Sequence, residues 1–283
     1  MTVVTDHMKS VHRACKILGI PRSIYYYQSR RDYQPVIKAL QAHIGRHPTY
    51  GFPKAQAYIR RAGNSWNHKR VHRVYKLLKL NLRRKGKRRI PARIKQPLEQ
   101  VNQPNEIWSI DFMQDSLLNG RKFRTFNAID DFNCEVLAIE IDTSLPATRV
   151  IRTLSQVLEL RGKPGKIRMD NGPEFISHKF ELWCKEHQIN LQYTQPGRPM
   201  HNGRVERFNG TYRRDILDAY LFEDLWQLKA LTEEYVEEYN NERPHKALNN
   251  LTPKEYLLKY GQLTSHQVKP DLPTVQQDNN IVL

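Results

Sequence analysis

Three acidic residues occupy places in the sequence where a carboxylate can do chemistry. Asp111 lies in the segment 108–112, where most neighbours are apolar, and a carboxylate inside such a strand is costly to bury unless it is paired or binds a metal. Asp170 precedes Asn-Gly-Pro at the end of an expected strand, where acids face the crevice of an α/β sheet. Glu206 lies near the start of an expected helix. Taken singly, Asp111 could be an ion-pair partner and Glu206 an acid favoured by the helix dipole.

Taken together, the three acids have the chemistry of a metal site. Fifty-eight residues separate Asp111 from Asp170, and 35 separate Asp170 from Glu206. Mg²⁺ takes hard oxygen ligands and keeps several of its waters, so three carboxylates suffice to hold it. The three cysteines are far apart and form no C-x-x-C pair, which argues against a disulfide framework or a cysteine zinc site.

The elements that must position these acids follow from periodicity and turn signals. Asn119-Gly120 is a hairpin signal between the first two expected strands. Three antiparallel strands followed by helix, strand, helix, strand and helix is the order of a ribonuclease-H-like α/β domain, a five-stranded mixed sheet with flanking helices. We expect strands at 106–115, 122–130, 135–142, 166–170 and 189–193, and helices at 148–161, 173–187, 202–219 and 224–240.

The net charge of +17 is concentrated in the first third of the chain. Residues 1–100 hold 24 basic and 3 acidic side chains, whereas the remaining residues hold 22 and 26. This asymmetry favours a polyanion-binding part joined to a separate working part, because so much like charge repels itself unless a partner neutralises it. The alternative is a basic surface that serves solubility.

This basic third is expected to be helical. Residues 8–28 predict two short helices around Gly19, which is typical either of a helix-turn-helix or of an ordinary helical hairpin. Three more helices are expected at 36–47, 53–62 and 68–80. The last has a basic face that either contacts phosphates or is solvated, and a basic arm follows that favours DNA over a plain linker. The candidate DNA-binding residues are Lys69, Arg70, Arg73 and Lys76 on the helix and Arg83, Arg84, Lys85, Lys87, Arg88 and Arg89 in the arm.

The motifs around the acids resemble a known family. They are Trp-x-x-Asp ending at Asp111, Asp-Asn-Gly-Pro-Glu-Phe from Asp170, and Val-Glu-Arg-Phe-Asn-Gly around Glu206. With the D-(35)-E spacing, they resemble the catalytic core of DDE transposases and retroviral integrases. The closest likeness is to the second-frame product of bacterial transposases of the insertion-sequence-three family. It extends over residues 35–262 and includes Tyr-Gly at 50–51 and Arg-Pro-His at 243–245.

The resemblance implies a DNA transposase that cleaves transposon ends and joins their 3′-hydroxyls to target DNA. Two Mg²⁺ ions, for which Mn²⁺ can substitute, would serve the attacking and leaving oxygens. Asp111 would bridge both ions, with Asp170 on one and Glu206 on the other. The expected partners are transposon ends, target DNA, at least a second copy of the chain, and an upstream-frame protein or fusion. A DNA-binding regulator with an unused site and a ribonuclease-H-like nuclease without strand transfer are the alternatives.

Helical spacing adds three candidates beside Glu206. Asn209 and Gly210 share its face of the helix, where the lack of a side chain at Gly210 would let DNA approach. Arg213, seven residues on, resembles the family's basic residue after the glutamate and would hold a phosphate near the metals as part of the catalytic set. Alternatively, Gly210 serves helix packing and Arg213 is solvated.

The sequence thus predicts a chain of several parts. No apolar stretch is long enough for a membrane helix and no signal peptide is evident, so we expect a cytoplasmic, nucleoid-associated protein without membrane contact. The expected parts are a helix-turn-helix remnant at 1–30, a helical DNA-binding domain with its arm at 35–90, a linker at 91–105, the catalytic core at 106–262 and a disordered tail at 263–283.

Overall fold

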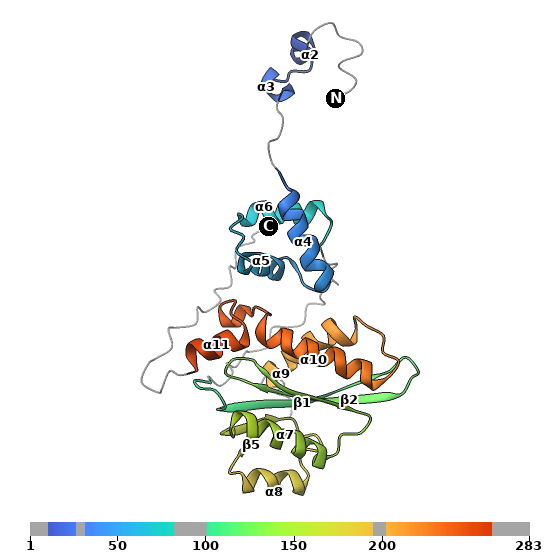
Figure 1. Cartoon of the computed structure of the whole chain (residues 1–283), viewed down its shortest axis with the longest axis vertical. Helices are drawn as coiled ribbons and strands as arrows, with labels where there is room; N and C mark the ends of the chain where they lie inside the picture. Colours follow the sequence, from blue (N-terminus) through green and yellow to red (C-terminus); the bar gives the residue numbers. More distant parts are fainter. Residues whose placement is uncertain (1–10, 27–31, 82–100, 195–201, 262–283) are drawn as a thin grey trace, which may run out of the picture. The chain divides into compact units, whose positions relative to one another are not determined.

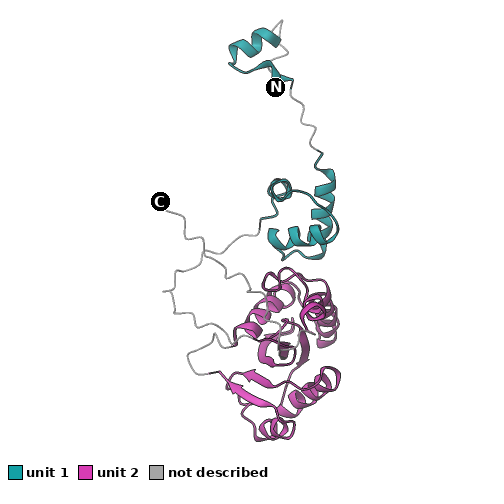
Figure 2. Cartoon of the chain, turned by 90° about the vertical axis from the view of Figure 1, so that its left-hand side faces the viewer, with its two compact units in different colours: residues 1–82 teal, residues 83–283 magenta. Residues whose placement is uncertain are grey.

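The computed structural model describes residues 11–26, 32–81, 101–194 and 202–261. The chain divides into two compact units, residues 1–82 and residues 83–283 (Figure 2). The predicted basic arm at 83–89, most of the linker and the C-terminal tail lie outside the described residues. Among the described residues, no helix has both the length and the apolar character that crossing a membrane requires.

The first unit is helical, as predicted. Gly19 has a positive φ of 63° and lies between the first two short helices. The next three helices enclose a small apolar core that includes Val36, Leu40 and Val71. Asn67 begins the last of them, because its side chain accepts a hydrogen bond from the backbone N–H of Lys69 at 2.8 Å. The helices are α2 (Val11–Ile17), α3 (Arg22–Tyr25), α4 (Gln34–Arg46), α5 (Phe52–Arg61) and α6 (His68–Leu77).

The second unit is built on a five-stranded mixed sheet with the order β3-β2-β1-β4-β5 (Figure 1). β1 to β3 are antiparallel, and β4 and β5 run parallel to β1. Gly120, with a φ of 81°, lies in the turn that joins the first two strands, which confirms the hairpin predicted there. The strands are β1 (Ile107–Ser116), β2 (Lys122–Asp130), β3 (Val136–Asp142), β4 (Lys166–Met169) and β5 (Asn190–Tyr193).

Helices cover both faces of this sheet (Figure 1). On one face Trp108 and Ile110 of β1 pack with α7 (Ala147–Arg161) and α8 (His178–Glu186). The other face carries α9 (Gly203–Tyr212) and α10 (Leu225–Asn241), whose buried residues form a second apolar cluster. Because successive strand residues point to opposite faces, Asp111 lies on the α9 face. The sheet and its helices confirm the ribonuclease-H-like architecture predicted from the sequence.

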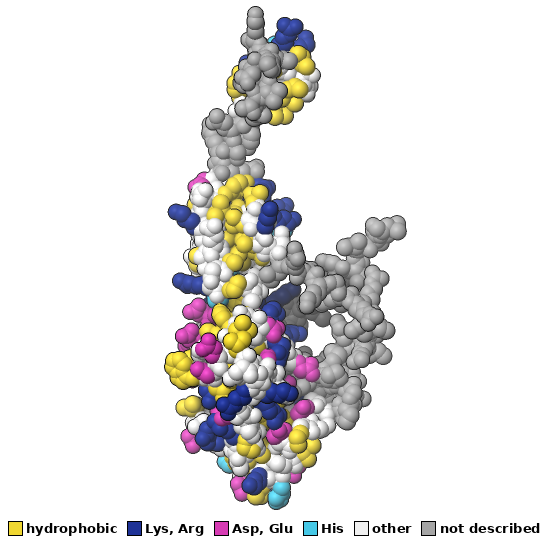
Figure 3. Space-filling view, turned by 90° about the vertical axis from the view of Figure 1, so that its right-hand side faces the viewer, with side chains coloured by type: hydrophobic (Ala, Val, Ile, Leu, Met, Phe, Trp, Pro, Cys, Tyr) yellow, Lys and Arg dark blue, Asp and Glu magenta, His cyan; other side chains and the backbone are white. Residues whose placement is uncertain are grey.

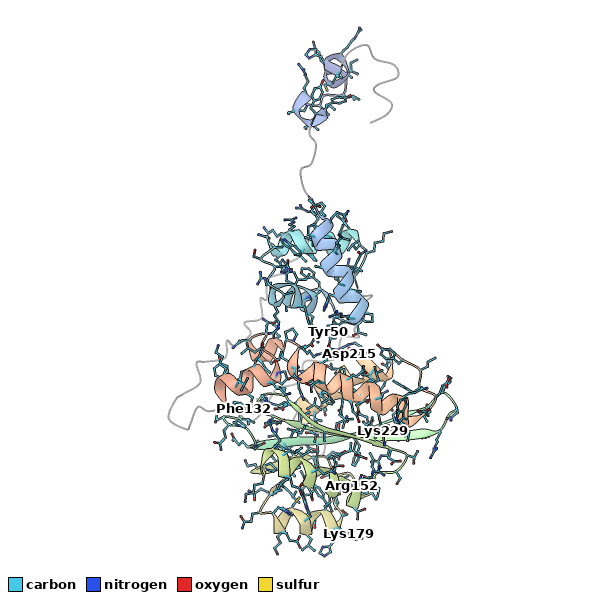
Figure 4. The ribbon with its side chains drawn as sticks, in the orientation of Figure 1. Tyr50, Phe132, Arg152, Lys179, Asp215 and Lys229 are labelled. Atoms are coloured by element: carbon cyan, nitrogen blue, oxygen red, sulfur yellow. The ribbon has the colours of Figure 1, made fainter. Side chains whose placement is uncertain are left out.

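Helical segments differ from the predictions in three places. The helix predicted to begin at Pro173 begins at His178, because residues 173–175 form a turn and Ser177 caps the helix. α9 ends at Tyr212 and continues as a π-helical turn, Arg213–Leu217, so the predicted single helix changes its winding. A further helix, α11 (Pro253–Tyr260), begins with a capping box at Thr252. It packs at the end of the sheet, where the rings of Tyr256 and Phe132 are 5.4 Å apart (Figure 4).

Candidate active site

Asp111 is held in the middle of β1 on the side of the sheet that α9 covers. Its Oδ1 accepts the backbone N–H of Phe112 at 2.9 Å, and its Oδ2 accepts Nδ2 of Asn209 at 2.8 Å. Asn202, just before α9, donates to the backbone oxygen of Ile110 at 3.2 Å and so ties the start of that helix to β1. The carboxylate is therefore oriented by its own strand and by α9.

Asp170 follows the last residue of β4 and is brought beside β1 by the parallel pairing. The register aligns Ser109 with Arg168, so two residues further along each strand Asp111 and Asp170 stand at the same level of the sheet. Asp170 is exposed, and its Oδ1 accepts the backbone N–H of Gly172 at 3.0 Å. The Asn-Gly-Pro turn thus places a backbone N–H donor beside the carboxylate that precedes the turn.

Glu206 lies in the first turn of α9 and is exposed. The apolar stripe of the same helix, Val205, Phe208 and Tyr212, is buried. Since α9 packs against β1 and β2, this burial fixes the side of the helix that carries Glu206. Three acids from three different elements are thereby brought to one region of the sheet.

Burial and the two neighbouring acids both affect the ionisation of Asp111. The pKa of Asp111 is raised to about 6, first because burial penalises its charge and then because Asp170 and Glu206 are negative. The hydrogen bonds from Phe112 and Asn209 oppose that rise. Burial also raises the pKa of Glu206. Within the described part of the chain, no three His, Cys, Asp or Glu side chains stand close enough together to hold a metal ion as they are arranged.

Known protein families match both units. A model described as an integrase core domain matches residues 101–199, and a second of the same description matches residues 187–253. A model described as an HTH-like domain matches residues 31–88. The uncharacterized 31.7 kDa protein of insertion element IS407 from Burkholderia multivorans is 34% identical over 273 residues, which are 95% of this chain and 96% of that protein. The chain belongs to the insertion-sequence transposases with an integrase core.

Other relatives agree with this assignment. The putative transposase InsK of insertion sequence element IS150 from Escherichia coli is 29% identical, over 84% of this chain and 89% of that protein. A simian T-cell lymphotropic virus intasome structure, solved with the PP2A regulatory subunit B56 gamma, matches with a TM-score of 0.50. The match covers 82% of this chain and 77% of that one at 16% identity, so it supports the fold alone. The protein is a transposase of the DDE type.

The side chain of Asn209 in this transposase is buried. The sequence put it among the DNA contacts, but its side chain is 8% exposed and both polar atoms of its amide are used inside the protein. Nδ2 donates to Asp111, and Oδ1 accepts Nδ2 of Asn127 at 2.7 Å. Gly210, by contrast, is exposed, and a Cβ there would meet no described atom within 4 Å. Close packing of α9 is therefore not the reason for glycine at 210.

Arg213 points back along β1 rather than into water. Its guanidinium donates to the carboxylate of Asp115 at 2.8 Å and to the backbone oxygen of Gln114 at 3.1 Å. Because Asp115 is four residues beyond Asp111, both acids lie on the same face of the strand. Arg213 thus connects the end of the Glu206 helix to β1, which the sequence did not predict.

The basic residues predicted on α6 divide into two kinds. Lys69 and Lys76 are exposed, whereas Arg70 donates to the backbone oxygen of Asp32 and Arg73 to the hydroxyl of Tyr33 at 3.2 Å. The two arginines therefore also hold the segment before α4. In the second unit acidic and basic side chains are interspersed on the face that Figure 3 shows, in agreement with the near balance of charge after residue 100.

Two residues beside the acids were not predicted from the sequence. One is Asn127, which faces Asp111 across the β1–β2 ladder. The other is Arg124, which forms an ion pair with Glu174 in the turn after Asp170. The hairpin signal at 119–120 could have given the cross-strand partner of Asp111, because the turn sets the register of the two strands. The Arg124–Glu174 pair had no signal in the sequence.

Proposed function

We propose that this transposase cleaves phosphodiester bonds at the ends of its element and joins the resulting 3′-hydroxyls to target DNA, with Asp111, Asp170 and Glu206 as its catalytic acids. The observation that carries the proposal is the electrostatic proximity of these acids, which come from β1, the turn after β4 and α9. A fold that gathers negative charge around a half-buried carboxylate is destabilised by it, and a divalent cation would reverse that effect.

The donor set fits a hard cation. The three side chains offer only carboxylate oxygens, which suit Mg²⁺ or Mn²⁺. Asp111 is already oriented, while Asp170 and Glu206 are exposed and therefore able to move towards it. We propose that these three residues hold two such ions. When bound, the ions supply an activated oxygen nucleophile and stabilise the leaving oxygen of an in-line displacement.

The neighbouring residues prepare this site. Asn209 and the backbone of Phe112 fix the carboxylate of Asp111, and the backbone N–H of Gly172 restrains that of Asp170. Arg213 is the candidate for holding a DNA phosphate next to the scissile one. It sits at the end of α9, and with 37% of its side chain exposed it can exchange Asp115 for a phosphate. Open space at Gly210 leaves room for the DNA backbone.

We assign DNA binding chiefly to the first unit and the arm that follows it. Lys69 and Lys76 on α6 are exposed and available to phosphates, and the arm at 83–89 adds six bases. Because an element has two ends that must be cut and joined together, we propose that at least two copies of the chain act on paired ends. A protein from an upstream frame would be an additional partner.

The test uses a labelled transposon end, a supercoiled target plasmid and Mg²⁺. We expect the wild-type chain to cut the end and join it, and Asp111→Asn, Asp170→Asn and Glu206→Gln each to lose both activities at least 100-fold while DNA affinity changes little. Each change removes a ligand charge with little change of shape. Cutting without joining would identify a nuclease, and binding with neither activity would identify a regulator. A variant with near wild-type strand transfer would remove its residue from the site.

A further inference from the structure

Two buried amide side chains form a line that ends on Asp111. Nδ2 of Asn127, on β2, donates to Oδ1 of Asn209 at 2.7 Å, and Nδ2 of Asn209 donates to Oδ2 of Asp111 at 2.8 Å. Asn127 is completely buried and Asn209 is 8% exposed. The line therefore runs from the centre of the sheet through α9 to a proposed catalytic carboxylate.

The direction of this line is fixed by chemistry. An ionised carboxylate has no hydrogen to give, so Asn209 must turn its Nδ2 towards Asp111. Its Oδ1 then faces Asn127, which must supply a donor. An amide rotated by 180° would set an oxygen against the carboxylate, which repels it. The donor at position 127 therefore stabilises the Asn209 amide in the orientation that Asp111 requires.

The fold itself gives little reason for asparagine at position 127. Asparagine is disfavoured in strands, and burying an amide is costly unless its hydrogen bonds are made. Within the described part of the chain, Oδ1 of Asn127 is buried without a hydrogen-bond partner. A β-branched apolar residue would suit a buried position in β2 better. What asparagine adds here is a donor directed at Asn209.

We propose that Asn127 is a positioning residue for the metal site. By fixing the amide of Asn209, it holds one oxygen of Asp111 in a hydrogen bond and leaves the remaining lone pairs of the carboxylate directed at the cation. The inference rests on the proposed function, because it assumes that Asp111 is a metal ligand. Partners behind a ligand orient it, and their loss typically weakens metal binding by about 10–100-fold.

The test compares two substitutions at position 127 with a matched control. Asn127→Leu keeps the number and branching of the side-chain heavy atoms and removes the donor. Asn127→Thr suits a strand, and its hydroxyl lies on a side chain one atom shorter than the amide. The control is Thr125→Val, because Thr125 is also completely buried on β2, points to the same face and is likewise without a hydrogen-bond partner for its hydroxyl in the described residues. Thermal unfolding identifies the variants that keep the fold.

Binding of Mn²⁺ to the full-length protein is measured by the electron paramagnetic resonance signal of free Mn²⁺, without DNA. We expect a folded Asn127 variant to bind Mn²⁺ about tenfold more weakly, and Thr125→Val to bind it as the wild type does. The Mg²⁺ concentration that gives half-maximal end cleavage should rise in parallel while the Kd for the DNA end stays unchanged. Wild-type Mn²⁺ affinity in a folded Asn127 variant, or an equal loss in Thr125→Val, would overturn the inference.

Asp111→Asn, measured alongside, separates this inference from the proposed function. If the wild type binds Mn²⁺ and Asp111→Asn does not, the metal site stands and the Asn127 variants decide the role of the amide line. If Asp111→Asn binds Mn²⁺ as well as the wild type, Asp111 is no ligand, and the proposed function fails together with the inference.

Discussion

At the scale of single residues, Asp111 combines two opposing demands. It must be ionised to attract a cation, yet it is half-buried and close to two further acids, so its ionised form is unfavourable in the metal-free protein. Two hydrogen bonds offset part of that penalty without removing it. The residue proposed to be most important for catalysis is therefore one that weakens the fold while no metal is bound.

This opposition can be measured as stability. In EDTA at pH 7.5 we expect Asp111→Asn to raise the melting temperature by about 3–5 °C, because the amide carries no charge to desolvate. Asp170→Asn serves as the control: Asp170 is exposed, so its substitution should change the melting temperature much less. Both variants should lose strand transfer. A lower melting temperature for Asp111→Asn would show that its hydrogen bonds outweigh the burial of its charge.

Asp111 also makes the stability of the metal-free fold depend on pH. The pKa of Asp111 is about 6 in the folded protein against an ordinary value of 3.8, so the folded state binds this proton more tightly than the unfolded chain. The stabilisation from this proton is present below pH 4 and is lost as pH rises from about 4 to about 6. In urea unfolding without metal, Asp111→Asn should make the fall in stability over that range less steep than in the wild type. An equal slope would contradict the raised pKa.

The sequence was sufficient to propose the three acids but did not indicate the side chains that the structure places around them. Asp111, Asp170 and Glu206 could be found because their types, motifs and spacing are visible along the chain. Asn127 and Arg124 act through contacts between distant segments, and a buried asparagine or a half-exposed arginine has no pattern of its own in one sequence. The burial of Asn209 and its bond to Asp111 could not be predicted, because helical spacing does not reveal which neighbour covers a helix face.

At the scale of elements, side-chain contacts hold the turn after Asp170 to the sheet. Arg124 of β2 forms an ion pair with Glu174 and lies over the ring of Phe112, with 4.3 Å between its Cζ and the ring centroid. Phe112 in turn stacks on Phe175 at 4.8 Å. Because Phe112 follows Asp111 directly, and Glu174 and Phe175 lie in the turn after Asp170, these contacts couple the positions of two of the proposed catalytic acids.

Removing the side chain of Arg124 should lower the rate of end cleavage more than it lowers the stability of the fold. We expect Arg124→Ala to lower single-turnover end cleavage roughly tenfold, because a small displacement of Asp170 is enough to impair catalysis. Arg149→Ala is the matched control: its side chain is 31% exposed against 30% for Arg124, and it pairs with Glu140 and Asp142 on β3 rather than with the turn after Asp170. Equal cleavage rates in the two variants would show that the turn holds its place without the ion pair.

One residue of the π-helical turn after α9 forms a buried ion pair with a residue outside the turn. Asp215 in that turn accepts a hydrogen bond from Arg243 at 2.7 Å, and their side chains are 6% and 2% exposed (Figure 4). Asp215 also pairs with the half-exposed Arg214 at 3.1 Å, and Arg243 is its buried partner. The pair ties the end of the Glu206 helix to the segment after α10.

Breaking this pair should destabilise the catalytic unit strongly. Arg243→Met removes the buried partner of Asp215 and leaves its carboxylate beside the half-exposed Arg214, 3.1 Å away. We expect the free energy of unfolding in urea to fall by about 3 kcal/mol. The double variant Arg243→Met, Asp215→Leu should recover much of that loss, since no buried charge remains. Additive losses in the double variant would show that the two residues act independently.

How far the elements could be predicted depends on how local their signals are. All five strands lie within one residue of their predicted bounds, because alternation and turn residues are local features. The helix expected from residue 173 begins at 178, since Pro173 starts a turn that serves Asp170 and Glu174. The π-helical turn at 213–217 had no local signal. Its winding accompanies the tertiary pairing of Asp215 with Arg243.

At the scale of the whole molecule, charge and chemistry are separated along the chain. The first 100 residues carry a large excess of bases, whereas the catalytic unit is close to neutral. Affinity for DNA and positioning of the reacting phosphate can therefore be altered independently. Neutralising the arm residues should flatten the dependence of log affinity on log salt. They are Arg83, Arg84, Lys85, Lys87, Arg88 and Arg89.

We expect the slope to become less steep by roughly 3 or more, because each phosphate contact contributes about 0.9. Fluorescence anisotropy of a labelled end in EDTA, with the full chain at several salt concentrations, gives the slope without cleavage. Neutralising Arg121, Lys122, Lys163, Lys166, Lys179 and Lys185, six bases of the catalytic unit, provides the comparison. An unchanged slope in the arm variant would show that residues 83–89 serve only as a linker.

The destabilising position of Asp111 also bears on how copies of an insertion sequence decay. Most random substitutions weaken a fold and lead to rapid removal of the protein. We expect replacement of Asp111 by a neutral residue to differ, because it would remove the proposed activity and strengthen the metal-free fold. Such a dead copy would persist in the cell with its basic unit intact and occupy element ends that an active copy needs. The residue proposed for cutting DNA would thereby also set how readily a genome accumulates inhibitors of its own mobile elements.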